Sequence, residues 1–365
     1  MASSSVVGLD IGSNQIKAVH LDRRRGGNWS LLGAGIVPTP PDSVQDGVIL
    51  DLPRVSEAVR QLFREYQLPN TDTVAAVSGS HVAVRSIKVP DMNLTTLKRS
   101  IRFEAAKHID PGANGVSIEN SAVEFEILRK TGSPPQLELL LVVAPQPMVN
   151  GRLSVMESAG LEPVAVDVEA FALLRAMDAA GLMPPPDQAA VVMNMGATYT
   201  DLNIIVGSEL AVPRSIPIGG NALTTSVASV LNLSTEDAEE RKRHLNVAPD
   251  APDNTGWAAD APDPTRQVTT PFIDELIREL RRSILYFQSQ AAEAGMSISV
   301  ERLILAGGGT QIQGLPEYLR QRLEMDVQVL DPLKLRNGDT PGAAAWEGRG
   351  PELAVAVGLA LKEYN

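Results

Sequence analysis

The stretch "VGLDIGSNQIKAVHL", residues 7–21, places a polar tip between two apolar segments. An apolar strand ends at Asp10, the chain turns through Gly12 and Ser13, and a second apolar strand begins at Ile16. Small residues at a hairpin tip expose backbone N–H groups that can surround a phosphate. Glycine lets the backbone approach a ligand closely because it has no Cβ. The sequence therefore predicts a phosphate-binding hairpin at the N-terminus.

The side chains of this tip favour the same interpretation. Ser13 and Asn14 add hydrogen-bond donors, and Lys17 adds a positive charge. The carboxylate of Asp10 suits a phosphate only if a divalent cation lies between them, which predicts a water-mediated Mg²⁺ contact. An isolated hairpin of this kind is usually only a turn, so the interpretation depends on further motifs.

A second hairpin with the same layout follows in "VVMNMGATYTDLNII", residues 191–205. Asn194, Gly196, Ala197 and Thr198 occupy the positions equivalent to those of the first tip. Two such hairpins indicate duplicated halves rather than a periodic solenoid. If the two tips face each other, they can clamp a polyphosphate from both sides.

A glycine triplet and a charged helix complete the pattern. "LILAGGGTQIQGL" places Gly307, Gly308 and Gly309 between an apolar strand and a helix, where a ligand could lie directly on the backbone. Residues 272–295 have the spacing of a long helix. Its polar stripe, which could bind a ribose or a purine edge, consists of Glu275, Glu279, Arg282, Ser283 and Tyr286. The alternatives are a tight packing turn and a solvated helix face.

Composition excludes several classes of function. The chain has 365 residues, of which 44% are hydrophobic, and this length predicts two or more folding units. It contains no cysteine, which excludes disulfides, thiol catalysis and cysteine-bound zinc and fits a reducing cytoplasm. The net charge of −12 disfavours nucleic acid and anionic lipid as partners. We expect no signal peptide and no membrane-spanning segment.

Two segments interrupt the duplicated halves. Residues 82–160 read as a strand, a helix and two further strands, which predicts a small inserted subdomain. Residues 248–265, "APDAPDNTGWAADAPDPT", are rich in proline, aspartate and alanine. Such a composition cannot bury enough apolar surface to offset the entropy of ordering, so we expect a mobile surface loop.

The order of these motifs resembles the actin/Hsp70/sugar-kinase superfamily. The two hairpins resemble its phosphate motifs, the glycine triplet its adenosine motif, and residues 166–176 and 354–361 its interdomain connectors. The resemblance sharpens to the PilM family of type IV pilus assembly proteins. "DIGSNQIKAV", "VEAFALLRA", "SIPIGGNALT" and "ELRRSILYFQSQ" are similar to sequences of that family, and the third of these adds Gly219 and Gly220 to the expected site.

The resemblance implies an α/β fold with actin/Hsp70-like, duplicated ribonuclease-H-type halves around a nucleotide cleft. The first lobe would comprise residues 1–83, 161–186 and 341–365, and the second lobe residues 187–340. Residues 84–160 would form an FtsA-type inserted subdomain that binds a partner.

The family also implies a function. The chain would be a cytoplasmic scaffold that binds ATP or ADP with Mg²⁺ and holds the N-terminal cytoplasmic tail of PilN between the first lobe and the insertion. It would lie at the inner face of the cytoplasmic membrane through this partner and serve twitching motility. The resemblance also allows contacts with pilus assembly ATPases and self-association. It implies neither nucleic-acid binding nor membrane insertion by the chain itself.

Two alternatives use the same fold. A small-molecule kinase needs a catalytic aspartate in the cleft, and residues 70–160 contain no motif that would supply it. An FtsA-like filament protein ends in a basic amphipathic helix, which we do not expect after "LKEYN".

One position departs from the family pattern. The second phosphate motif usually begins with aspartate, and here residue 194 is asparagine. An amide brings no charge to a metal shell, so we expect ATP binding with weak or absent hydrolysis. Asp167 and Glu169 lie two residues apart in the connector. In an extended chain this spacing points both side chains to one side. One of the two carboxylates could then orient a water at the γ-phosphate. Alternatively, Asp167 caps the following helix.

Overall fold

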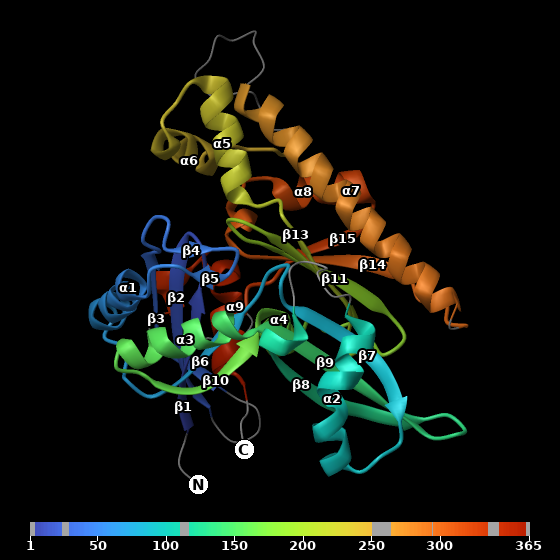
Figure 1. The fold of residues 1–365 in the computed structure, drawn as a ribbon. Helices are drawn as coiled ribbons and strands as arrows, with labels where there is room; N and C mark the ends of the chain where they lie inside the picture. Colours follow the sequence, from blue (N-terminus) through green and yellow to red (C-terminus); the bar gives the residue numbers. More distant parts are fainter. Residues whose placement is uncertain are drawn as a thin grey trace.

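The computed structural model describes residues 4–23, 29–109, 117–249, 264–293, 295–334 and 343–362. Two five-stranded sheets form the framework (Figure 1). The first has the order β10-β6-β1-β2-β3, with β1 (Ser4–Ile11), β2 (Gln15–Arg23), β3 (Trp29–Pro38), β6 (Asp72–Val77) and β10 (Glu162–Val168). The second has the order β13-β12-β11-β14-β15, with β11 (Ala189–Met195), β12 (Thr200–Val206), β13 (Glu209–Ile216), β14 (Val300–Ala306) and β15 (Asp326–Val329).

The two sheets are copies of one topology. β1 is antiparallel to β2 and parallel to β6, and β11 is antiparallel to β12 and parallel to β14. Each sheet therefore starts with a hairpin and continues through parallel strands that require crossover connections. This arrangement confirms the duplicated halves that the two hairpin motifs predict.

Four helices and a short hairpin complete the first lobe. They are α1 (Leu52–Glu65), α3 (Gln146–Ser158), α4 (Glu169–Ala180), α9 (Gly350–Ala360), β4 (Val44–Gln45) and β5 (Val48–Ile49). Every residue of α9 is buried. A Cβ on Gly358 would collide with the Ala172 carbonyl, so α9 and α4 can approach this closely only with glycine there. The two connector segments thus pack against each other.

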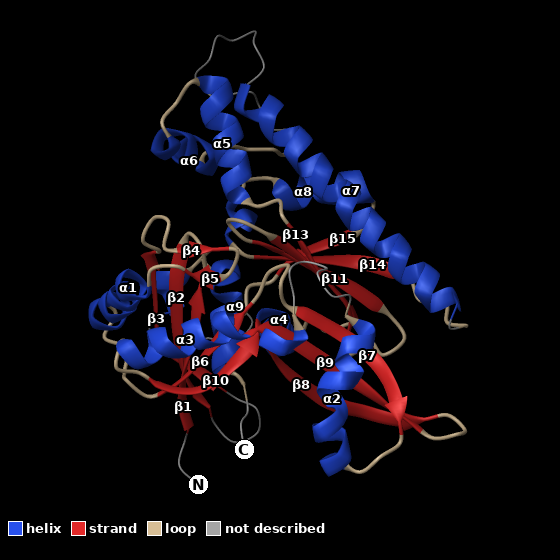
Figure 2. Cartoon of the chain, viewed as in Figure 1, coloured by secondary structure: helices blue, strands red, loops and turns tan. Residues whose placement is uncertain are grey.

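The inserted subdomain is an antiparallel sheet with one helix (Figure 2). Its strands β7 (Ala83–Pro90), β8 (Ser121–Thr131) and β9 (Gln136–Pro145) pair in the order β7-β9-β8, with a short 3-10 turn, η2 (Ile118–Asn120), before β8. Buried Leu139 and Leu141 of β9 pack against α2 (Leu94–His108). Helix α3, in contrast, places Val155 and Met156 in the core of the first lobe. We therefore propose 83–145 as the extent of the insertion and assign α3 to the first lobe.

The second lobe carries four helices and a 3-10 turn. They are α5 (Gly220–Leu231), α6 (Thr235–Arg243), α7 (Pro264–Glu293), α8 (Leu315–Leu323) and η3 (Gly308–Gln311), and a further 3-10 turn, η4 (Ala343–Trp346), precedes α9. Helix α7 begins eight residues earlier than the predicted start at 272, with Pro271 inside it. Thr265 is already buried within α7, so the predicted loop cannot extend to residue 265. Most of that loop, residues 250–263, lies outside the described residues.

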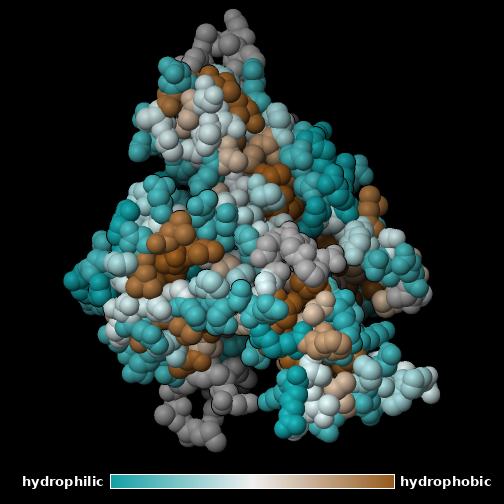
Figure 3. Space-filling model, in the orientation of Figure 1, coloured by the Kyte–Doolittle hydropathy of each residue, from teal (hydrophilic) through white to brown (hydrophobic). Residues whose placement is uncertain are grey.

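The surface in view is mixed. In Figure 3, hydrophilic residues cover most of this face, and hydrophobic residues form separate patches. Within the ranges that the structure describes, no helix combines the length and apolar character needed to cross a membrane.

Candidate nucleotide site

The two hairpin tips meet at the base of the cleft between the lobes. Ser13 Oγ and Thr198 Oγ1 are 2.7 Å apart and share a hydrogen bond. Both tips have the same turn, because the Gly12 N–H donates to the Gln15 carbonyl at 3.0 Å and the Gly196 N–H donates to the Tyr199 carbonyl at 2.9 Å. The structure therefore brings together two motifs that lie 185 residues apart in the chain.

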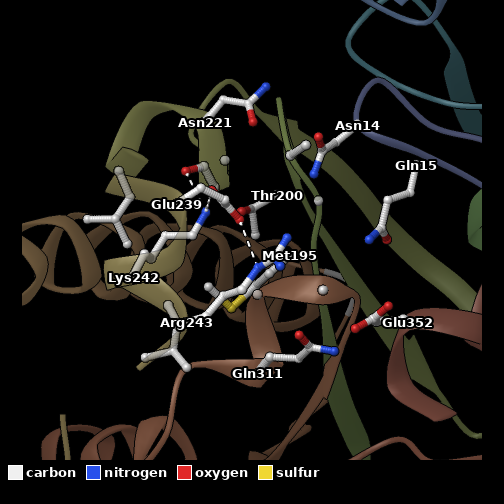
Figure 4. Close-up of a pocket in the computed structure, with 18 of the residues that line it drawn as sticks. Asn14, Gln15, Met195, Thr200, Asn221, Glu239, Lys242, Arg243, Gln311 and Glu352 are labelled. Carbon is white, nitrogen blue, oxygen red and sulfur yellow. Dashed lines mark hydrogen bonds and ion pairs between the residues drawn. The ribbon is translucent and has the colours of Figure 1, made fainter. Parts of the chain in front are cut away.

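A cavity of about 120 Å³ opens between these tips, the glycine triplet and α6, and we call it the hairpin cavity. Figure 4 shows Asn14 and Gln15 of the first hairpin opposite Lys242 and Arg243 of α6, with Gln311 and Glu352 below. The predicted residues that line it are Asn14, Lys17, Gly196, Ala197, Gly219, Gly220, Gly308 and Gly309. Gly12, Ser13 and Thr198 form the tips beside it.

The glycine triplet is held against the second hairpin. Gly307 has a φ of +83°, and a Cβ there would lie 2.5 Å from Asn194 Oδ1. Only glycine accommodates both the left-handed backbone and this approach. A Cβ on Gly308 would meet nothing within 4 Å, so the turn presents an open backbone surface to the cavity.

Helix α6 supplies charged residues that the sequence motifs do not identify. The Lys242 ammonium contacts Glu239 Oε2 at 2.6 Å and Thr224 Oγ1 at 2.9 Å, and both Glu239 and Lys242 line the hairpin cavity. A carboxylate beside an ammonium can bind a hydroxyl-rich group such as ribose together with a phosphate oxygen. The signal in the sequence is the dense charge of "EERKR" (239–243) directly after a Ser234 cap.

The polar stripe of α7 does not reach this cavity. Arg214 of β13 donates to Ser283 Oγ at 2.9 Å and pairs with Glu279. Glu279 in turn pairs with Arg282 at 2.7 Å. Because α7 turns Glu279 and Ser283 inward onto β13, these predicted nucleoside contacts are internal ion pairs and hydrogen bonds.

The charges at the first tip are paired across the hairpin. Lys17 Nζ lies 3.0 Å from Asp10 Oδ2, and both side chains are 15% exposed. Burial alone would lower the pKa of Lys17, but the negative charges of Asp10, Glu169 and Glu352 outweigh burial and raise this pKa above its ordinary value. Lys17 is therefore a fixed cation beside the hairpin cavity.

The predicted metal contacts are engaged with other residues. Asp10 pairs with Lys17, and the Asn194 amide donates to Glu169. Across the described part of the chain, no group of three or more acidic, histidine or cysteine side chains could hold a metal ion.

Asp167 and Glu169 do not share a side. Asp167 pairs with Arg175, and Lys362 approaches it at 3.3 Å, so it links α4 to the end of α9. It does not cap α4, whose N-cap is Val168 without a side-chain bond. Glu169, the first residue of α4, instead meets Asn194 across the cleft. The chain leaves the extended conformation between the two carboxylates, and this separates them.

Glu169 lines a cavity other than the hairpin cavity. A second cavity, of about 550 Å³, lies between the first lobe, the insertion and the second lobe, and we call it the insertion cavity. Glu169 and Asp201 both line it. Burial and the nearby carboxylates of Asp201 and Asp10 raise the pKa of Glu169, and burial raises the pKa of Asp201.

Comparison with known proteins agrees with this geometry. The family model described as type IV pilus assembly protein PilM matches residues 8–364. The chain belongs to the PilM family. Among solved structures, the PilM-PilN type IV pilus biogenesis complex superimposes with a TM-score of 0.81 at 28% identity, covering 99% of this chain and 98% of that one.

More distant relatives of this PilM-family chain share its fold. Cell division protein FtsA of Escherichia coli (strain K12) is 22% identical over 386 residues, covering 97% of this chain and 89% of that protein. The structure of MreB 5 of Spiroplasma citri bound to AMPPNP has a TM-score of 0.53 at 13% identity, covering 98% of this chain and 95% of that one. These matches establish the actin-like fold that the two sheets display.

Proposed function

We propose that this chain is a nucleotide-binding scaffold of the type IV pilus inner-membrane assembly complex. ATP or ADP would occupy the hairpin cavity, with the phosphates at the two tips and the nucleoside toward Glu239 and Lys242. The proposal rests on one observation: both hairpin tips, the glycine turn and the Lys242 ammonium border the same cavity. Nucleotide binding by MreB 5, which has the same fold, is consistent with it.

The hairpin cavity has to widen to accept a nucleotide. Its volume of about 120 Å³ is below the ~300–1,000 Å³ of ordinary ligand pockets. The Ser13–Thr198 hydrogen bond joins the tips where the phosphates would lie. We therefore expect binding to separate the tips and to exchange this bond for bonds to phosphate. Mg²⁺ would accompany the nucleotide and neutralise phosphate charge, with Asp10 as the acidic residue of this tip.

We expect slow hydrolysis, because the residues that could assist it are poorly suited to do so. Asn194 carries no charge, and Asp167 is held by Arg175. Glu169 has a raised pKa, so at neutral pH it is a poor acceptor for the proton of an attacking water. Steady-state phosphate release and ATP affinity, measured together for the parent and Asn194→Asp, test this. Turnover by the parent at about 1 per second or faster would be an ordinary enzymatic rate and would refute the scaffold role of ATP.

The second part of the proposal concerns PilN. The N-terminal cytoplasmic tail of PilN would dock in the insertion cavity, which the first lobe borders through Ser78 and Val82 and the insertion through Arg85 and His108. The similar solved structure is a complex with a PilN, which supports this class of partner. Docking of this kind would place the chain in the cytoplasm, at the inner face of the membrane, without a spanning segment of its own.

Titration with a PilN N-terminal peptide, with and without ATP, tests the docking. Val82→Glu places a charge in the insertion cavity, whereas Val230→Glu changes an exposed residue, 61% accessible, on α5. We expect the peptide to bind the parent and Val230→Glu and to lose affinity for Val82→Glu, with the folding of each variant checked by thermal melting. Equal affinity for all three proteins would exclude the insertion cavity as the docking site.

A further inference from the structure

The insertion cavity contains two carboxyl groups from opposite lobes. Glu169 begins α4 in the first lobe, and Asp201 lies on β12 in the second. Their partners among the described residues are neutral: Ser78 and Asn194 bond to Glu169, and Ser215 bonds to Asp201. The Glu169 pair with Asn194 joins the lobes, and Glu169 and Asp201 both line the cavity.

A buried amide lies beside these carboxyls. Asn203 is two residues after Asp201 on β12, lines the same cavity and is 2% exposed. Its Nδ2 has no hydrogen-bond partner in the parts of the chain that the structure describes. A buried N–H group without an acceptor costs free energy, so this atom favours a ligand that brings a carbonyl or other acceptor.

The cations near the cavity have other partners. Arg214 bonds to Ser283 and Glu279, and Arg85 donates to the Val84 carbonyl at 3.1 Å. His108 also lines the cavity, at its insertion side. Two cations act on Glu169 from the first lobe. Lys17 pairs with Asp10 at 3.0 Å. Arg152 donates to the Ala76 carbonyl at 2.9 Å and to the Ile11 carbonyl at 3.3 Å, and its Nη1 has no hydrogen-bond partner among the described residues.

We propose that the insertion cavity recognises a positively charged group of the docked peptide, which lies between Glu169 and Asp201, while Asn203 Nδ2 donates to a carbonyl of the same peptide. This inference rests on the proposed docking of the PilN tail. An ammonium or guanidinium supplies several donors to two acids that otherwise face each other, and a peptide supplies the acceptor as well. The cation has two possible sources, the N-terminal amine and a lysine or arginine side chain.

Peptide variants separate these sources. The probe is the N-terminal peptide of PilN from the same organism. It is prepared with a free terminus, with an acetylated terminus, and with its lysine and arginine residues replaced by norleucine and citrulline. We expect one of the two neutralisations to weaken binding to the parent by at least about tenfold. The neutralisation that has this effect identifies the source of the charge.

Protein variants locate the recognition. Glu169→Gln and Asp201→Asn remove one negative charge each and keep the shape, and Asp178→Asn is a matched control on the exposed side of α4. We expect each cavity variant to lower the affinity for the charged peptide by at least about tenfold and to leave the affinity for the neutral peptide unchanged. Asp178→Asn should change neither affinity.

The outcomes distinguish the two proposals. If charged and neutral peptides bind the parent equally, the docking stands and charge recognition is refuted. If a cavity variant weakens both peptides equally, these residues shape the cavity without recognising a cation, which also refutes the inference. If the unmodified peptide does not bind the folded parent, the docking itself fails and the inference falls with it.

Discussion

Replacing Lys17 with methionine tests the charge arrangement beneath the first hairpin tip. Lys17 Nζ is 3.0 Å from Asp10 Oδ2, and both side chains are 15% exposed. Removing one partner of a buried ion pair costs ~3–5 kcal/mol because the other charge stays buried. Residual exposure reduces this loss, whereas the nearby carboxylate of Glu352, which also acts on the ammonium, adds to it. We therefore expect Lys17→Met to lower the free energy of unfolding by about 3 kcal/mol at pH 7.

The double variant Asp10→Asn/Lys17→Met separates stability from binding. It leaves no lone charge at Asp10, so most of the lost stability should return. ATP affinity should not return, because a bond from a charged donor contributes about 1.5–3 kcal/mol and the donor is gone, which corresponds to a loss of at least about tenfold.

Urea denaturation and isothermal titration with ATP measure the two quantities. Recovery of ATP affinity in the double variant would show that Lys17 does not contact the phosphates. A single variant as stable as the parent would show that the ion pair does not stabilise this hairpin.

Three further predictions concern the two cavities. Lys242→Ala should weaken ATP binding about tenfold, and Arg282→Ala should not change it, because only Lys242 lines the hairpin cavity; equal effects in titration would contradict this placement. Glu169→Gln should stabilise the protein increasingly as pH rises from 5 to 8 in urea melts. The parent loses stability as pH rises through the raised pKa of Glu169, whereas glutamine does not titrate. A stability difference that does not change with pH would contradict this prediction. Gly196→Val should weaken ATP binding, because its Cβ would lie 2.9 Å from the Tyr199 carbonyl and displace the second tip; unchanged affinity by titration would count against the tip as a phosphate contact.

The sequence predicted the elements whose signals are local. A glycine turn between two apolar runs defines a hairpin wherever it occurs, so both tips and the duplication were correct. The predicted start of α7 was wrong: the predicted helix begins after Pro271, and Pro271 instead lies inside the helix. Buried Thr265 and Thr269, which precede it, show that tertiary packing extends the helix.

The side of a helix that faces a ligand was not predictable in the same way. A stripe of charged residues on α7 could face solvent, a ligand or another strand, and its spacing is the same in all three cases. Arg214, which lies 65 residues before Glu279, decides the outcome by pairing with it. Likewise, the short helix α6 has a mostly polar sequence, so its sequence alone does not identify Lys242 as a cavity residue.

The two hairpins have the same backbone arrangement but carry different charges at equivalent positions. In the first ladder Asp10 lies opposite Lys17, and in the second ladder Asn194 lies opposite Asp201. The first pair is neutral overall and keeps a cation beside the phosphate tip. The second pair has only a negative member, and it faces Glu169 rather than a cation. Ionising two adjacent buried carboxyl groups together is unfavourable. A proton or a positive group between Asp201 and Glu169 would therefore stabilise this pair. If ATP and a peptide bind as proposed, asparagine at position 194 would weaken hydrolysis, and the acid at position 201 would provide a contact for the peptide from the same hairpin.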